Sequence, residues 1–127
     1  RPAWLSLVPK EALPRVEILP AYAGVDADLF DAALAAGARG LVLALPGHGS
    51  LPEALRPPVR RAVEEGVTVV RASRIGPGVW HNHNEDDDGL GLIAAERLNV
   101  WQARVLLILA LASELEKAEI ASLFAKL

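Results

Sequence analysis

The sequence predicts an α/β domain, a small three-layer α/β/α structure around a mainly parallel sheet of four strands. Short apolar runs alternate with segments that carry helix start and stop signals, as in successive βαβ units. One run, residues 40–45 (GLVLAL), is apolar throughout, which is typical of a strand covered on both faces. The chain has 127 residues, of which 52% are hydrophobic, enough for one domain with a real core. A Rossmann-like or flavodoxin-like shape follows.

Four segments are expected to form the strands. Residues 16–19 (VEIL) are a short, partly β-branched run, and residues 40–45 follow after a helical segment. Residues 67–72 (VTVVRA) predict the third strand, and residues 91–94 (GLIA) predict a short fourth. Between these two, residues 73–88 are rich in Gly, His and acidic side chains, which predicts a long loop.

Capping signals mark the expected helices. Ser50 with Glu53 forms a capping box, and so does Asn99 with Gln102, whereas the prolines at 57 and 58 should interrupt or kink the helix that contains them. The helices expected are listed in chain order: from Asp26 or Asp28 through Leu34, closed by Gly37; from Ser50 through Glu65, closed by Gly66; Val100–Ala112; and residues 117–126.

Composition excludes several classes of partner and site. The net charge is −3 with acids and bases interspersed, so no basic face argues for nucleic acid. The chain has no cysteine, which excludes disulfides and thiolate metal sites. The longest apolar segment, residues 105–112, is too short to cross a bilayer, so no membrane partner is expected. The Pro-rich start predicts that residues 1–14 are a linker remnant and that the domain spans 15–127.

The polar residues gather at one predicted edge of the sheet. Ligands of parallel sheets bind outside the carboxyl ends of the strands. The loops that leave these ends contain Tyr22, then His48 and Ser50, and then the long loop at 73–88. The Gly47-His48-Gly49-Ser50 turn could cradle a phosphate, or its glycines could only provide positive φ beside a Ser50 helix cap. In either case the His48 side chain points near the ligand edge.

The run His81-Asn82-His83-Asn84-Glu85-Asp86-Asp87-Asp88 has two readings. Its His and carboxylate side chains could bind a divalent metal, or the segment could be a solvated loop. One acid in such a loop could also reach a ligand amine through a charge-assisted contact. A nucleophile within the chain is not evident, because the single threonine, Thr68, lies in a predicted strand and no serine has an evident base and orienting acid.

Several short pieces, taken in order, resemble the C-terminal domain of bacterial-type L-asparaginases. They cover nearly the whole chain and are, in order, residues 8–10 (VPK), 21–24 (AYAG), 47–50 (GHGS), 69–74 (VVRASR), 98–99 (LN) and 103–107 (ARVLL). The resemblance implies an amidohydrolase that converts L-asparagine to L-aspartate and ammonia without a cofactor, some members accepting L-glutamine. It also implies that the nucleophilic threonine, a threonine–aspartate–lysine set and a tyrosine lie in an N-terminal domain. This chain contains none of those motifs.

The same resemblance assigns the contact residues. In the family the C-terminal domain packs against a neighbouring subunit and lends its active site a polar residue and an acid. The polar residue is usually Asn in a Gly-Asn-Gly-Asn turn; here it is His48, and Ser50 replaces the second Asn. The implied acid is Glu85, with Asp86 as the fallback, and Tyr22, Ser50 and Asp86 are accessory candidates. An imidazole charges near about pH 6.5, and a cationic His48 would repel a substrate ammonium.

Two hypotheses follow. In the first, the chain is the C-terminal domain of an L-asparaginase that assembles as a homodimer or homotetramer, and it has no catalytic residue, no bound metal and no amidase activity on its own. In the second, it is a stand-alone module that binds a small ligand or a metal through His48, His81, His83 and the neighbouring acids. The first leaves both a cytoplasmic and an exported parent protein open.

Overall fold

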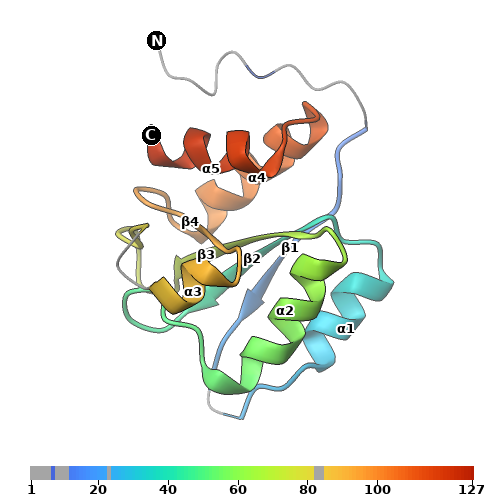
Figure 1. Cartoon of the computed structure of the whole chain (residues 1–127), viewed down its shortest axis with the longest axis vertical. Coiled ribbons are helices and arrows are strands. Elements are labelled where there is room, and N and C mark those ends of the chain that lie inside the picture. The colour runs from blue at the N-terminus through green and yellow to red at the C-terminus, as the bar shows by residue number, and fades with distance from the viewer. Residues whose placement is uncertain (1–6, 8–11, 23, 82–84) are drawn as a thin grey trace.

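The computed structural model describes residues 7, 12–22, 24–81 and 85–127, and for Glu85 the backbone alone. Figure 1 shows the central sheet with helices on both of its faces. The elements are β1 (Val16–Pro20), α1 (Asp28–Ala35), β2 (Gly40–Leu45), a short 3-10 helix η2 (Glu53–Leu55), α2 (Arg56–Glu64), β3 (Thr68–Ser73), α3 (Glu85–Gly89), β4 (Ile93–Ala94), α4 (Val100–Ala112) and α5 (Lys117–Ala125). The predicted three-layer α/β fold is confirmed. Most of the predicted linker, residues 1–14, lies outside the described residues.

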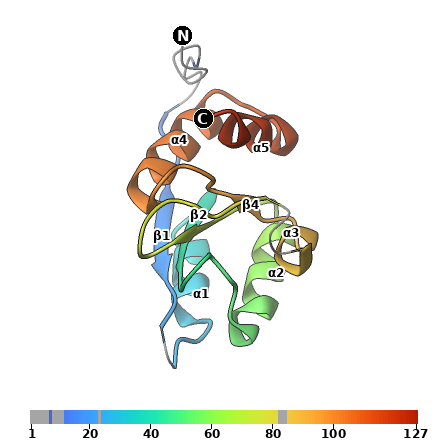
Figure 2. The ribbon, with the colours of Figure 1, turned by 90° about the vertical axis from the view of Figure 1, so that its left-hand side faces the viewer.

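The sheet is parallel throughout, in the order β1-β2-β3-β4. Because each strand is added on the same side of the last, right-handed crossovers place α1, α2 and α3 together on one face. Figures 1 and 2 both show this layer, with α4 and α5 on the opposite face. All strands therefore end at one edge, where the loops after β1, β2 and β3 lie side by side.

Two apolar cores hold the three layers together. In β2, Leu41, Leu43 and Leu45 belong to the core under α1 and α2, whereas Val42 belongs to the core under α4 and α5. The alternation follows from the two-residue period of a strand, and it explains why the whole of β2 is apolar. Gly40 lets α4 come close, since a Cβ there would lie 2.8 Å from Cδ2 of Leu107. None of the helices in the described part is long and apolar enough to cross a membrane.

The helix that follows the Gly47–Ser50 turn begins differently from the prediction. Ser50 is exposed and caps neither η2 nor α2, because Pro52 is extended and separates it from the first helical residue. The prolines at 57 and 58 do not interrupt α2 either. They occupy its first turn, where a backbone N–H has no partner within the helix and the fixed φ of proline suits the geometry.

The start of α4 and the glycine after α1 are as predicted, whereas the N-cap of α1 is Ala27 and not Asp26 or Asp28. Asn99 accepts a hydrogen bond from the backbone N–H of Gln102 at 2.9 Å, and Gln102 accepts one from the backbone N–H of Asn99 at 3.0 Å, which fixes the start of α4. The N–H of Asp28 donates to the carboxylate of Asp26 at 3.0 Å, where α1 begins. Gly37 follows the end of α1 with φ +86°.

The long loop predicted over residues 73–88 is the main error in the expected fold. Its last part forms α3, a helix of five residues whose sequence is EDDDG. A helix this short and this acidic has no apolar periodicity and could not persist alone. Contacts with residues distant in sequence stabilise it, and these contacts build the candidate site.

Candidate functional site

The Gly47–Ser50 turn follows β2 at the carboxyl edge of the sheet, as predicted. Gly49 is buried with φ +82°, and a Cβ there would lie 2.7 Å from Cγ1 of Val79, so only glycine fits. The hydroxyl of Ser73, the last residue of β3, donates to the carbonyl oxygen of Gly47. With its glycine packed inward and its backbone tied to β3, the turn presents His48 and Ser50 to solvent.

The helix α3 is joined to this turn through Asp87. This residue is only 1% exposed, yet it carries a carboxylate. One oxygen, Oδ2, accepts a hydrogen bond from the backbone N–H of Leu51 at 2.9 Å, and the other, Oδ1, accepts one from Nη1 of Arg56 at 2.7 Å. Leu51 follows the turn directly, and Arg56 begins α2. The predicted solvated acidic loop is therefore wrong for Asp87, because the acid is paired and buried.

A second buried ion pair attaches α3 to the sheet. Arg71 lies in β3, and its side chain is 1% exposed. Its Nη2 donates to Oδ1 of Asp88 at 2.9 Å and to the carbonyl oxygen of Trp80 at 2.7 Å. The exposed ring of His81 lies on the other oxygen of Asp88, at 3.4 Å from its Nδ1. Arg71 thus fixes both α3 and the segment that follows β3.

A shallow hollow beside the turn contains Tyr22. It has a volume of about 280 Å³ and lies at the ends of β1 and β2, with Pro46, Pro52 and Arg74 among its lining residues. Nη1 of Arg74 donates to the carbonyl oxygen of Ala21 at 2.9 Å, which ties the segment after β3 to the segment after β1. Tyr22 itself is 53% exposed and available to a ligand or a second surface.

The structure places most of the predicted site residues at one edge. His48 and Ser50 lie in the turn and Tyr22 in the hollow next to it. Glu85 is the first residue of α3, and its side chain lies outside the described part of the chain. The side chain of Asp86 is exposed, while its backbone carbonyl accepts a hydrogen bond from Nη2 of Arg56 at 3.2 Å.

The metal-binding hypothesis finds no support in the part of the chain that is described. No group of three or more His, Cys, Asp or Glu side chains there could hold an ion. His83, which that hypothesis also needs, lies outside the described residues. Two of the acids it would use are paired with arginine instead, Asp87 with Arg56 and Asp88 with Arg71.

Sequence reasoning missed the residues that build this edge, namely Arg56, Arg71, Asp87 and Asp88. One signal could have revealed part of the network. Arg71 interrupts a strand that is otherwise apolar (TVVRAS), and a charge in such a strand needs a buried partner of opposite charge. The run of three aspartates in the following loop was the obvious source of that partner. The sequence contains no comparable signal for the bond between Leu51 and Asp87.

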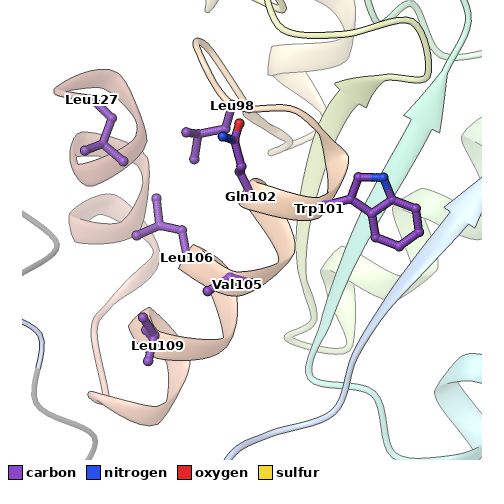
Figure 3. A pocket seen from close by; sticks show the side chains of 7 residues that line it. All are labelled: Leu98, Trp101, Gln102, Val105, Leu106, Leu109 and Leu127. Atoms are coloured by element: carbon purple, nitrogen blue, oxygen red, sulfur yellow. The ribbon is translucent and has the colours of Figure 1, made fainter.

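A second hollow lies on the opposite face of the molecule, and its chemistry is different. It is an apolar groove of about 480 Å³ along α4, lined by Leu98, Trp101, Gln102, Val105, Leu106, Leu109 and Leu127. Figure 3 shows Leu127, which follows the end of α5, across from Leu106 and Leu109, with Trp101 projecting from the other side of α4. Among the described residues that line the groove none is titratable, and Gln102 is the most polar of them.

The polar edge, in contrast, has groups that can bind a polar ligand. It offers an exposed imidazole and hydroxyl on a fixed turn, an exposed phenol, and a short acidic helix held in place beside them. Within the described residues no serine or threonine hydroxyl is hydrogen-bonded to a histidine, the arrangement that would activate a nucleophile. The edge can therefore contribute polar contacts to a ligand.

The chain is similar to a family of known proteins. Residues 15–124 match the glutaminase/asparaginase C-terminal domain. The chain is 42% identical over 114 residues to L-asparaginase 2 of Bacillus subtilis, covering 90% of this chain and 30% of the relative. It is 37% identical over 116 residues to a glutaminase-asparaginase of Acinetobacter glutaminasificans, covering 90% and 35%. A probable periplasmic L-asparaginase of Haemophilus influenzae is 38% identical over 102 residues, covering 80% and 29%.

The chain thus spans about a third of the length of the curated relatives it matches. The family match covers every strand and nearly all of the helical sequence, from β1 to the last turn of α5. It also includes the turn, the hollow and α3, the three parts of the polar edge. This chain belongs to the glutaminase/asparaginase C-terminal domain family.

Proposed function

We propose that this chain is the C-terminal domain of an L-asparaginase, which hydrolyses L-asparagine to L-aspartate and ammonia. Its role is to form a subunit interface and to lend His48 and Glu85 to the active site of a neighbouring subunit. The observation that carries the proposal is the junction of the His48 turn with α3, the helix that begins at Glu85, at a single edge of the sheet. Relatives named L-asparaginase and glutaminase-asparaginase support the reaction.

The two lent residues suit a zwitterionic amino acid. The carboxylate of Glu85 would accept charge-assisted hydrogen bonds from the substrate ammonium. The imidazole of His48 would hydrogen-bond the substrate in its neutral form, since only that form can both donate and accept. Removing the charge in Glu85→Gln should cost about 1.5–3 kcal/mol of binding, which is about 10-fold to 100-fold in KM. The kcat should change less, because the contact is present both before and during the reaction.

Lending between subunits can be tested by complementation. One subunit of the longer protein carries Glu85→Ala, and the other carries a substitution of the nucleophilic threonine in its N-terminal part. Each homo-oligomer should be inactive at substrate concentrations well below the raised KM. Co-expressed, they should form hybrid sites that combine an intact nucleophile with an intact Glu85, and asparaginase activity should return.

The matched control for this experiment pairs two variants of the same chain, Glu85→Ala and His48→Ala. Hybrids of these two place both defects in the lent surface, so each hybrid site still lacks one contact and full activity should not return. If the Glu85→Ala and threonine variants recover no activity although they form hybrids, Glu85 does not serve a neighbouring subunit. Native mass spectrometry of the mixture establishes that the hybrids exist.

The role of His48 has a separate test based on pH. Acidic solution favours the cationic form of an imidazole, and a cationic ring near the substrate ammonium should raise KM. His48→Asn keeps a donor and an acceptor without titrating. The KM of the variant should therefore rise less than that of the native protein on the acidic side. Identical acidic limbs in the two KM profiles would contradict a substrate contact by His48.

The isolated chain provides a further test of the division between domains. Because the nucleophile is proposed to lie outside these residues, the chain assayed alone at high concentration should release no ammonia from L-asparagine. Release above a blank would contradict the proposal. The longer protein should sediment as a homodimer or homotetramer, since a lent residue requires a neighbour, and a monomeric active enzyme would contradict the lending.

A further inference from the structure

We propose that Asp87 is a positioning residue that joins the His48 turn and α3 into one rigid unit. This inference rests on the proposed function, because it concerns how His48 and Glu85 are held at the spacing that one substrate requires. Asp87 itself would not touch the substrate. It lies beneath the surface, 1% exposed, between the two segments that it connects.

The geometry of the Asp87 carboxylate supports this role. Its Oδ2 accepts the backbone N–H of Leu51 at 2.9 Å, immediately after the turn that carries His48. Its Oδ1 accepts Nη1 of Arg56 at 2.7 Å, at the start of α2. Glu85 lies two residues before Asp87 in the same short helix. A single side chain therefore relates the backbone of the turn to the backbone of α3.

The choice of a carboxylate here is not explained by stability. Burying an ion pair removes two charges from water, and apolar side chains of similar volume are often as stabilising. What the carboxylate adds is direction, because its two oxygens accept from two separate segments at fixed angles. A short acidic helix such as α3 has little intrinsic preference for one position, so this direction determines where Glu85 stands.

The ion pair between Arg71 and Asp88 provides an internal comparison. Asp88 belongs to the same helix as Asp87, and Arg71 is buried in β3. This pair ties α3 to β3 and to Trp80 rather than to the turn. Loss of this pair should loosen α3 from the sheet. Loss of Asp87 should instead separate α3 from the His48 turn. The two buried pairs are thus distinguishable by which segment becomes mobile when each is broken.

The first test uses the longer protein that contains this chain, with L-asparagine as substrate. Asp87→Ala should raise KM by about 10-fold or more while kcat changes less than about 3-fold, since small misplacements of binding groups cost up to about 100-fold. Asp87→Asn keeps an oxygen for the N–H of Leu51 and should raise KM less. Asp31→Asn is the control, because Asp31 forms an exposed pair with Arg61 at 3.5 Å, and it should leave KM unchanged.

The second test measures backbone amide exchange in the same variants. Asp87→Ala should speed exchange in residues 47–51 and in residues 85–89 together, and Asp88→Ala should speed it in 85–89 alone. Adding Asp87→Ala to a variant that already carries both Glu85→Ala and His48→Ala should raise KM no further, because Asp87 acts only through these two residues.

The outcomes separate the two proposals. If Asp87→Ala and Asp87→Asn lower the melting temperature but leave KM and the exchange of residues 47–51 unchanged, Asp87 is only a structural residue and the inference is overturned. If instead Glu85→Ala and His48→Ala leave KM unchanged, the proposed function fails, and the positioning role fails with it. Joint changes in exchange and KM in Asp87→Asn, the variant least prone to unfold, support both.

Discussion

Two regions of the described molecule with arginine–carboxylate pairs differ in their burial. At α3, Asp87 pairs with Arg56, and Arg71 pairs with Asp88. The side chains of Arg71 and Asp87 are 1% and 2% exposed, and each is bound to more than one group. On the outside of α1 and α2, Arg61 and Asp31 are 54% and 61% exposed and lie 3.5 Å apart. The same two chemical groups meet in both regions, but the buried pairs hold the candidate site together whereas the exposed pair is surrounded by water.

The comparison teaches that position, rather than residue type, decides what an ion pair does. An exposed pair gains little because water screens it and its side chains lose freedom. A buried pair contributes little net stability either, but it cannot be halved without leaving an uncompensated charge. The stability of the fold should therefore fall strongly when one partner of a buried pair is replaced, and much less when both partners are replaced by apolar residues.

The largest effect is expected from Arg71→Ala. The substitution removes the buried partner of Asp88 and the donor to the carbonyl of Trp80. The free energy of unfolding should therefore fall by about 3–5 kcal/mol. Urea unfolding of this chain measures the change. The double variant Arg71→Met with Asp88→Leu removes both charges and should recover most of the loss. A double variant as unstable as Arg71→Ala would show that the hydrogen bond to Trp80, not the buried charge, dominates.

The next largest effect concerns the turn beside this network. Gly49→Ala requires a left-handed backbone and places a Cβ 2.7 Å from Val79, so it should cost about 2–4 kcal/mol from both causes together. Gly47→Ala is a matched control, since Gly47 also has positive φ (+54°) but no neighbouring atom within 4 Å. It should cost only the conformational part, about 1 kcal/mol. Equal losses in the two variants would show that contact with Val79 is unimportant.

The same contrast explains how much could be predicted from the sequence. The bounds of β2 and α4 are as expected, because a continuous apolar run and a capping box are local signals that need no distant partner. The helix α3 was missed because EDDDG is stabilised by Arg56 and Arg71, which are far away in sequence. Ser50 was assigned a cap that it does not form, since Pro52 intervenes.

The candidate site divides in the same way. Glycines on both sides of His48, after an apolar strand, predict a turn at the carboxyl edge, and the structure has the turn there. The link from that turn to α3 runs through the backbone N–H of Leu51, and no residue type at that position announces such a bond. The substrate contacts of His48 and Glu85 stay predictions, because they depend on a neighbouring surface.

A moderate effect is expected at Asn99, a half-buried residue whose side chain caps a helix. Asn99→Ala removes the side chain that caps α4, and it should lower the free energy of unfolding by about 1 kcal/mol. Asn99→Ser retains a hydroxyl acceptor and should recover much of this. Thermal unfolding of the two variants checks the difference. If both lose the same amount, the capping bond is not the cause.

The smallest effect is expected from Asp31→Ala, the counterpart of the buried substitutions. Asp31 and Arg61 lie more than half exposed and 3.5 Å apart, so their pair should contribute less than about 0.5 kcal/mol. Salt should weaken even this contribution, because exposed charges are screened at physiological ionic strength. Urea unfolding at low and high salt, beside Arg71→Ala, measures the contrast directly. A loss above about 2 kcal/mol in Asp31→Ala would mean that exposure does not separate the two regions, and the division between site-forming and surface pairs would have to be abandoned.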